Sequence, residues 1–242
     1  MISEQSDRAW DLVALGDSTP TGYGVGEDSS YVQFYAKHIE EDLGVDVSVH
    51  NWATNEIRRV IDWVKVVRNN DELRRDLLDA EVITLWMGWY DVILSFIIER
   101  EDSSRNLRRD IDVDRLHQVT SPMQSAFDKL LLEIVLLAEP EETLVLIAEV
   151  GIPSLFVERC KEYGILDQWK KYTYEPWRNY IIQAARKHQV HLVPTYEIIN
   201  GPDGNQEMPC EYMQSDGVHF NREGHKLLAE AHRRVGYQYS AP

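Results

Sequence analysis

Short apolar runs alternate with stretches of helical spacing along most of this 242-residue chain, and the alternation limits the folds open to it. Strand followed by helix, repeated, is typical of the crossover units that build a parallel sheet. Each apolar run has about the length of a buried strand. The predicted strands cover residues 12–15, 45–49, 82–86, 144–150 and 190–193. The sequence therefore predicts a single α/β domain over residues 1–242, with a five-stranded parallel sheet and helices on both faces.

Apolar residues at helical spacing fill the intervals between these strands. The predicted helices cover residues 31–43, 57–67, 121–137, 176–188 and 222–234. In the second helix, Ile57 and Ile61 belong to the stripe that is expected to face the core. Ser121 and Pro122 carry the signal of a helix start, because serine caps helices well and proline favours the first position. Asn221 can cap the last helix in the same way.

Two segments lie outside this alternation, near residues 92–120 and 153–174. The first joins an apolar run, residues 92–98, to a strongly charged stretch, and the second is rich in aromatic residues. We expect both to be insertions over one end of the sheet, as a lid or a subunit contact. A solvated helix followed by an ordinary connection is the alternative interpretation. The apolar run is consistent with a homo-oligomer.

Charge and cysteine content restrict the partners. The chain carries 25 Lys and Arg against 41 Asp and Glu, and the net charge of −16 repels nucleic acid and acidic membrane surfaces. The N-terminus lacks a signal-peptide pattern, and no apolar run approaches the roughly 18 residues of a membrane span. We therefore expect a cytoplasmic protein without a membrane span or a nucleic-acid partner.

Cys160 and Cys210 lie outside any Cys-x-x-Cys motif, so neither a disulfide framework nor a zinc site is expected.

The motif Gly16-Asp17-Ser18 directly follows the first predicted strand. Ligands of open parallel sheets bind beyond the carboxyl ends of the strands, so this serine is placed for chemistry. A serine hydroxyl becomes a good nucleophile only when a base removes its proton and a third group orients that base. Asp216 and His219 follow the last predicted strand, three residues apart, and one turn of chain would bring the carboxylate to the imidazole. Both loops lie at the same edge of the sheet, so a meeting of Ser18 with His219 is expected.

Other interpretations of these residues remain open. Asp17 and Ser18 also suit an ordinary turn or a helix cap. The stretch from Ser18 to Gly22 could instead cradle a phosphate of a flavin, although Pro20 removes one N–H donor. A phosphate loop gives no reason for a carboxylate and a histidine at the far end of the chain.

A metal cluster is a further alternative for this part of the chain. His225 and His232 could join Asp216 and His219, but their seven-residue spacing puts them on a helix that also needs a buried face. No metal and no cofactor is therefore predicted.

Together, the two motifs resemble those of the SGNH hydrolases, also called the GDSL-type esterases and lipases. The resemblance covers nearly the whole chain, with Gly16-Asp17-Ser18 similar to the first block and Asp216-Gly217-Val218-His219 similar to the last. It implies a flavodoxin-like three-layer fold with strand order 2-1-3-4-5. It also implies a carboxylic-ester hydrolase that works through an acyl-enzyme. Ser18 would be the nucleophile and an oxyanion donor through its backbone N–H, His219 the general base and then acid, and Asp216 the residue that orients it.

The chain departs from the family pattern in two places. The third block is Gly-x-Asn-Asp in the family, and its asparagine amide stabilises the oxyanion, whereas this chain has Tyr90 at that position. The second block lacks its glycine, so Asn55 or Glu56 has to supply that backbone N–H. The Tyr90 hydroxyl or the Asn55 amide is expected to replace the missing donor. A degenerate, catalytically impaired binding protein on the same fold and an acyltransferase are the alternatives.

The remaining candidate pocket residues are Asp17, Trp52, Gly88, Trp89 and Asp91, near the ends of the first three strands. Aromatic surface there would favour a sugar or an extended apolar acyl group, while core packing is the alternative for the tryptophans. Carboxylates at the edge of the sheet disfavour an anionic substrate. The expected substrate is therefore a neutral small-molecule ester.

Overall fold

The computed structural model of the chain describes residues 9–93, 97–99, 105–107, 113–138, 142–202, 206 and 208–237. Its main sheet holds five parallel strands in the order β2-β1-β3-β6-β7. These strands are β1 (Trp10–Gly16), β2 (Val47–Asn51), β3 (Val82–Trp86), β6 (Leu144–Ala148) and β7 (His191–Val193). The α/β class and the strand order 2-1-3-4-5 are both confirmed.

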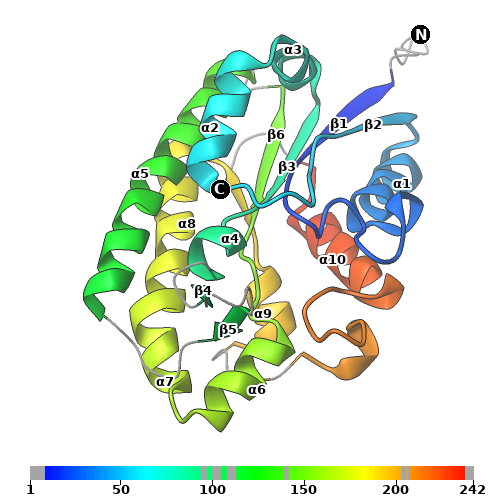
Figure 1. Cartoon of the computed structure of the whole chain (residues 1–242). Coiled ribbons are helices and arrows are strands. Elements are labelled where there is room, and N and C mark those ends of the chain that lie inside the picture. Colours follow the sequence, from blue (N-terminus) through cyan, green and yellow to red (C-terminus); the bar gives the residue numbers. More distant parts are fainter. Residues whose placement is uncertain are drawn as a thin grey trace, which may run out of the picture.

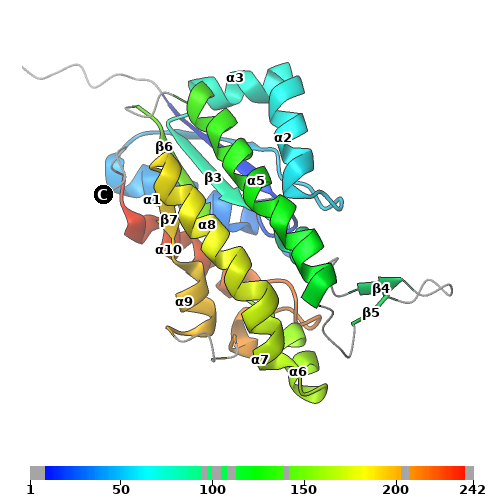
Figure 2. The ribbon, with the colours of Figure 1, turned by 90° about the vertical axis from the view of Figure 1, so that its left-hand side faces the viewer.

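Helices cover both faces of this sheet. The longer ones are α1 (Tyr31–Leu43), α2 (Val60–Asn69), α3 (Asp71–Asp79), α5 (Val113–Leu137), α8 (Glu175–His188) and α10 (Arg222–Val235). The pair α1 and α10 packs together on one face, while α2, α5 and α8 pack in a row on the other (Figure 1). Figure 2 shows α5 and α8 running side by side across that second face. The result is a three-layer sandwich, and the three inner strands β1, β3 and β6 are almost wholly buried because helices cover both of their sides.

Strand register brings the carboxyl ends of neighbouring strands level. Ala14 of β1 lies opposite Asn51 of β2, and Gly16 lies opposite Trp86 of β3. The residues that follow these strands therefore emerge at one edge of the sheet. The shorter elements are η1 (Glu27–Ser29), α4 (Trp89–Ile93), α6 (Ser154–Glu162), α7 (Leu166–Trp169), the π-helix η2 (Lys170–Tyr174), α9 (Thr195–Asn200) and η3 (Cys210–Tyr212).

The helix start predicted at Ser121 is wrong, because α5 begins at Val113 and Pro122 lies in its interior. Packing against α2 and α8 outweighs the loss of one backbone hydrogen bond at the proline. In α2, the stripe expected to face the core is only partly correct. Ile57 precedes the helix and Ile61 lies on its outer side, and their exposed fractions are 48% and 37%. The cap at Asn221 is confirmed, since its side chain accepts two backbone N–H groups of the first turn of α10.

The two expected insertions are described to different extents. From the first, near residues 92–120, the structure describes a short antiparallel hairpin of β4 (Ile97–Glu99) and β5 (Arg105–Leu107) and the start of α5. Residues 94–96, 100–104 and 108–112 lie outside the described residues. The second, residues 153–174, folds into α6, α7 and η2 beside the carboxyl edge of the sheet. Their roles as a lid or a subunit contact stay predictions.

No helix within the described ranges is long and apolar enough to cross a membrane. Both cysteines are free thiols, with Cys160 buried and Cys210 exposed.

Candidate active site

Ser18 lies in the turn that follows β1, at the carboxyl edge of the sheet. The chain passes very close to β3 here, and a Cβ atom on Gly16 would lie 2.1 Å from the carbonyl oxygen of Trp86. Gly16 also has a φ of 154°, so both the close contact with β3 and the backbone conformation favour glycine at this position. The backbone N–H of Asp17 donates to the same carbonyl oxygen. The Thr21 hydroxyl donates to the Ser18 carbonyl over 2.7 Å, and these contacts fix the serine above the sheet.

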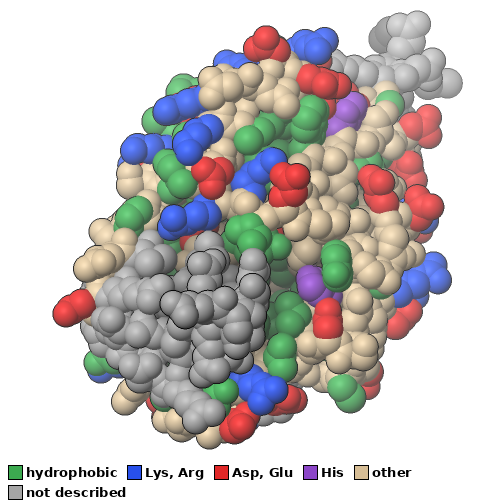
Figure 3. All heavy atoms as spheres, in the orientation of Figure 1, with side chains coloured by type: hydrophobic (Ala, Val, Ile, Leu, Met, Phe, Trp, Pro, Cys, Tyr) green, Lys and Arg blue, Asp and Glu red, His purple; other side chains and the backbone are tan. Residues whose placement is uncertain are grey.

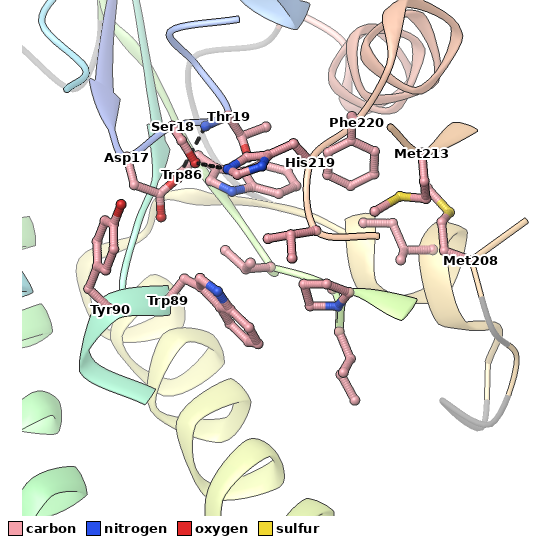
Figure 4. Close-up of a pocket in the computed structure, with 16 residues that line it drawn as sticks. Asp17, Ser18, Thr19, Trp86, Trp89, Tyr90, Met208, Met213, His219 and Phe220 are labelled. Atoms are coloured by element: carbon pink, nitrogen blue, oxygen red, sulfur yellow. Dashed lines mark hydrogen bonds between the residues drawn. The ribbon is translucent and has the colours of Figure 1, made fainter. Parts of the chain in front are cut away.

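Asp216 and His219 lie on the loop that precedes α10. Asp216 Oδ1 accepts the backbone N–H groups of Val218 and His219 over 2.9 and 3.0 Å, so the residues form the single turn that their spacing predicts. The turn brings Asp216 Oδ2 to 2.6 Å from His219 Nδ1. On the other side of the ring, His219 Nε2 lies 3.1 Å from Ser18 Oγ (Figure 4). The structure thus joins a serine, a histidine and a carboxylate from opposite ends of the chain.

Electrostatics set the direction of hydrogen bonding along this chain of contacts. Burial alone would raise the pKa of Asp216, but hydrogen bonds from the backbone and the imidazole of His219 and from the Val218 backbone lower it below its ordinary value. An ionised Asp216 only accepts hydrogen bonds, so His219 Nδ1 carries the proton and donates to it. The lone pair of His219 Nε2 then faces the Ser18 hydroxyl and can take its proton.

A pocket with a cavity of about 170 Å³ opens beside Ser18 and His219. Its apolar wall includes Trp86, Trp89, Met208, Met213 and Phe220, which Figure 4 shows around the space beside the Ser18–His219 contact. In Figure 3, hydrophobic side chains gather beside a histidine near the middle of this face. No Lys or Arg is found among the described residues that line the pocket. The site therefore suits an uncharged, largely apolar group.

Asp17 forms part of the same pocket. It is 6% exposed, and burial raises the pKa of its carboxyl to about 7, against hydrogen bonds from the backbone N–H groups of Thr19 and of Asp17 itself. Oδ1 accepts the Thr19 N–H over 3.3 Å. Oδ2 is buried and has no hydrogen-bond partner among the described residues.

The candidate oxyanion residues lie on three loops. Tyr90, in the first turn of α4, lines the pocket. The side chain of Asn55 accepts a hydrogen bond from the Thr21 hydroxyl over 2.8 Å, which ties the loop after β2 to the serine turn. The backbone N–H of Glu56 donates to Thr54 Oγ1 over 3.1 Å and is already engaged. Of the two backbone donors that the sequence offers, Asn55 is therefore the better placed.

Three residues that the sequence assigns to the pocket lie outside its lining. Trp52 donates from Nε1 to Asp76 Oδ2 over 2.7 Å, on the side of the β2 loop that faces α3. Gly88 packs against α5 and α8, since a Cβ atom there would lie 2.8 Å from the Phe127 ring. Asp91 accepts the Val60 N–H over 2.9 Å and joins α4 to α2. A position just after a strand thus did not by itself predict which way a side chain points.

Several pocket residues were missed by sequence reasoning. Met208, Met213 and Phe220 come from the irregular stretch between α9 and α10, which carries no periodic pattern. The nearest signal was the proximity of Phe220 to His219 in the sequence. Tyr23 was also missed, although its ring packs against the imidazole of His219.

His225 and His232, the histidines of the metal-site alternative, have other partners. His225 Nδ1 accepts the backbone N–H of Tyr31 over 3.1 Å, and His232 Nε2 lies 3.1 Å from the Thr84 hydroxyl. Burial lowers the pKa of each to about 4, so both are neutral core groups. Within the part of the chain that the structure describes, no three His, Cys, Asp or Glu side chains gather as a metal site.

Comparison with known proteins identifies the family of the chain. The sequence matches the family described as GDSL-like Lipase/Acylhydrolase over residues 12–232. A search of curated proteins found no match. Among solved structures, the lipase Lip_vut3 from a goat rumen metagenome has a TM-score of 0.74 and 22% identity, covering 95% of this chain and 99% of its own. A lipase/acylhydrolase from Enterococcus faecalis has a TM-score of 0.59 at 16% identity, covering 93% and 94%.

The psychrotrophic esterase EstA from a Pseudoalteromonas species, solved with the inhibitor monoethylphosphonate, has a TM-score of 0.57 at 15% identity, covering 93% of this chain and 95% of its own. At these identities, the three structures establish the likeness of fold. The family match covers nearly the whole sequence and includes both motifs. The chain therefore belongs to the GDSL-like lipase/acylhydrolase family, a family of carboxylic-ester hydrolases.

Proposed function

We propose that the protein is a serine esterase that hydrolyses neutral carboxylic esters through an acyl-enzyme. The observation that carries the proposal is the continuous set of contacts Asp216–His219–Ser18 at an apolar pocket. Ser18 Oγ attacks the ester carbonyl carbon while His219 Nε2 takes its proton. The tetrahedral intermediate then breaks its bond to the alcohol, which leaves with that proton. Water attacks the acyl-enzyme in turn, with His219 as base, and the carboxylic acid is released.

The oxyanion of the tetrahedral intermediate needs hydrogen-bond donors near Ser18. We assign two of them to the backbone N–H groups of Ser18 and Asn55, which belong to adjacent loops joined through Thr21. The Tyr90 hydroxyl, in the first turn of α4, is a third candidate because Tyr90 lines the pocket. A side-chain donor of this kind is worth about 10²- to 10³-fold in turnover.

The lining and volume of the pocket also indicate which class of substrate it fits. Its apolar wall and modest volume fit a short to medium acyl chain, or an apolar alcohol of similar size. A net charge of −16 and the absence of Lys and Arg from the described pocket lining disfavour anionic substrates. Neutral esters are the substrates to test first.

The test is hydrolysis of p-nitrophenyl acetate, butyrate and octanoate by the wild type and by Ser18→Ala. Ser48→Ala, an exposed serine on β2, is the matched control. We expect Ser18→Ala to lose activity by on the order of 10⁴-fold or more, and the control to keep it. Stoichiometric labelling of the wild type by a fluorophosphonate, absent from Ser18→Ala, would identify the nucleophile.

One observation favours a second candidate, a catalytically impaired binding protein: Tyr90 occupies the family's asparagine position. A folded wild type that neither hydrolyses these esters nor reacts with the fluorophosphonate would support this alternative. If that protein were also yellow as purified, a bound flavin would be the ligand to examine.

A further inference from the structure

Asp17 carries the one carboxyl group among the described pocket residues, and it immediately precedes the proposed nucleophile Ser18 in the sequence. Its Oδ1 accepts the Thr19 N–H, while its Oδ2 is buried and has no hydrogen-bond partner among the described residues. Figure 4 shows the carboxyl of Asp17 on the side of the pocket that also holds the Tyr90 hydroxyl, below Ser18. A buried polar atom without a partner among the described residues thus belongs to a residue in the wall of the pocket.

The surroundings of Asp17 do not compensate a negative charge. Among the described residues, Tyr31 of α1 interacts electrostatically with Asp17, and Tyr90 of α4 and His219 of the loop before α10 line the same pocket. None of the described lining residues is Lys or Arg. A buried carboxylate without a cation or a full set of donors is costly, so the neutral acid is favoured. The raised pKa of Asp17, about 7, agrees with this.

The proposed reaction also favours the neutral form of the Asp17 carboxyl. Attack by Ser18 places a negative charge on the carbonyl oxygen of the ester, in the pocket that Asp17 lines. An ionised Asp17 would repel that charge, whereas its protonated form can donate a hydrogen bond to it. A carboxylic acid kept neutral by an apolar site serves as an oxyanion donor in other enzymes.

We propose that Asp17 works as an uncharged carboxylic acid, whose Oδ2–H donates a hydrogen bond to the carbonyl oxygen of the ester as the oxyanion forms. The proton stays on Asp17 throughout, and no bond of Asp17 is made or broken. This role rests on the proposed esterase function. It adds a side-chain donor to a pocket in which tyrosine stands in the place of the family's asparagine.

The first test is the pH dependence of kcat/KM for a p-nitrophenyl ester. In the wild type, kcat/KM should fall on the alkaline side, with a midpoint near pH 7, as Asp17 ionises. Asp17→Asn keeps an N–H donor in the same place but cannot ionise, so this alkaline fall should disappear while activity near pH 6 is retained. Asp17→Ala has no donor and should lose about 10²-fold at every pH. Asp167→Asn, which removes the charge of an exposed side chain on α7, should keep the wild-type profile.

The second test does not require activity. The folded pKa of Asp17 is raised, so the wild type should lose stability as pH rises from about 4 to about 7, and Asp17→Asn should not. The unfolding temperature of Asp17→Asn, relative to the wild type, should therefore be higher at pH 8 than at pH 5. An equal difference at both values would show that Asp17 is not held neutral, and would overturn the proposal.

The outcomes separate the two proposals. An active wild type whose alkaline fall persists in Asp17→Asn overturns the donor role alone. A wild type that hydrolyses no ester and resists the fluorophosphonate overturns the esterase function, and the donor role with it. In that case the stability comparison still decides whether Asp17 is a neutral acid.

Discussion

Tyr23 stacks on the imidazole of His219, with ring centroids 4.3 Å apart and an angle of 33° between the planes. Tyr23 is 46% exposed, so its ring covers the histidine from the solvent side. Gln214 links the two loops that carry these rings, because its Nε2 donates to the carbonyl oxygens of Tyr23 and Phe220 over 2.6 and 2.8 Å. The imidazole is therefore held by Asp216 at one nitrogen, by Ser18 at the other and by an aromatic ring across its face.

Replacing Tyr23 tests whether this stacking positions the base. Tyr23→Ala should lower kcat by about 5- to 10-fold with little change in KM, since an aromatic pair contributes on the order of 1 kcal/mol. Tyr23→Phe keeps the ring and should behave as the wild type. Steady-state kinetics on a p-nitrophenyl ester gives both parameters. A Tyr23→Phe variant as slow as Tyr23→Ala would assign the effect to the hydroxyl and contradict the stacking role.

Replacing Asp216 tests the orientation of the imidazole. Asn at this position can still accept the two backbone N–H groups, but its amide does not hold the imidazole in the productive tautomer, so kcat should fall by about 10²- to 10⁴-fold. Because the pKa of Asp216 is lowered, the acid limb of the wild type should not report this carboxyl. An unchanged rate would remove Asp216 from the mechanism.

Tyr90→Phe tests the third oxyanion donor. If the hydroxyl binds the oxyanion, the variant should lose about 10²-fold in kcat while its unfolding temperature stays close to that of the wild type. The double variant with Asp17→Ala distinguishes two independent donors from one, because independent losses multiply. Unchanged turnover in Tyr90→Phe would leave Asp17 and the backbone as the donors.

Stability at acid pH should depend on His232. The side chain is fully buried between Thr84 and the Leu228 carbonyl, and burial lowers its pKa to about 4. The unfolded chain takes up a proton near pH 6.5, whereas the folded protein does not until about pH 4, so stability should fall as pH drops through this window. The full effect is about 3 kcal/mol. Denaturant unfolding of His232→Gln at pH 5 and pH 8 should show a smaller pH difference than the wild type. An equal difference would mean that His232 does not drive the loss.

The sheet and the contacts that join Ser18, His219 and Asp216 were predictable because both leave local signals. The strands β1, β3 and β6 are largely buried and appear as mostly apolar runs. Ser18 lies in the turn after β1, and His219 lies in the loop between the last strand and α10, so parallel topology brings both to one edge of the sheet.

The start of α5 and most of the pocket lining depended on tertiary contacts that no local sequence pattern encodes. Pro122 carries a helix-start signal, yet packing between α2 and α8 extends α5 beyond it. Asp91 follows β3 as a pocket residue would, but its partner is the start of α2. Met208 and Met213 reach the pocket from either side of the short helix η3, in a stretch where neither period nor propensity gives a direction.

The division of the site between the two ends of the chain makes activity a sensitive probe of their association. Ser18 depends on β1, while His219 depends on the docking of α10 against α1, which the Tyr31–His225 hydrogen bond and the Arg233–Asp42 ion pair secure. Should α10 detach while the rest of the sheet stays folded, the base would leave the nucleophile although most helical structure remained. Inactivation on gentle heating would then precede the loss of circular dichroism, and the gap between the two would measure how firmly the last helix is held.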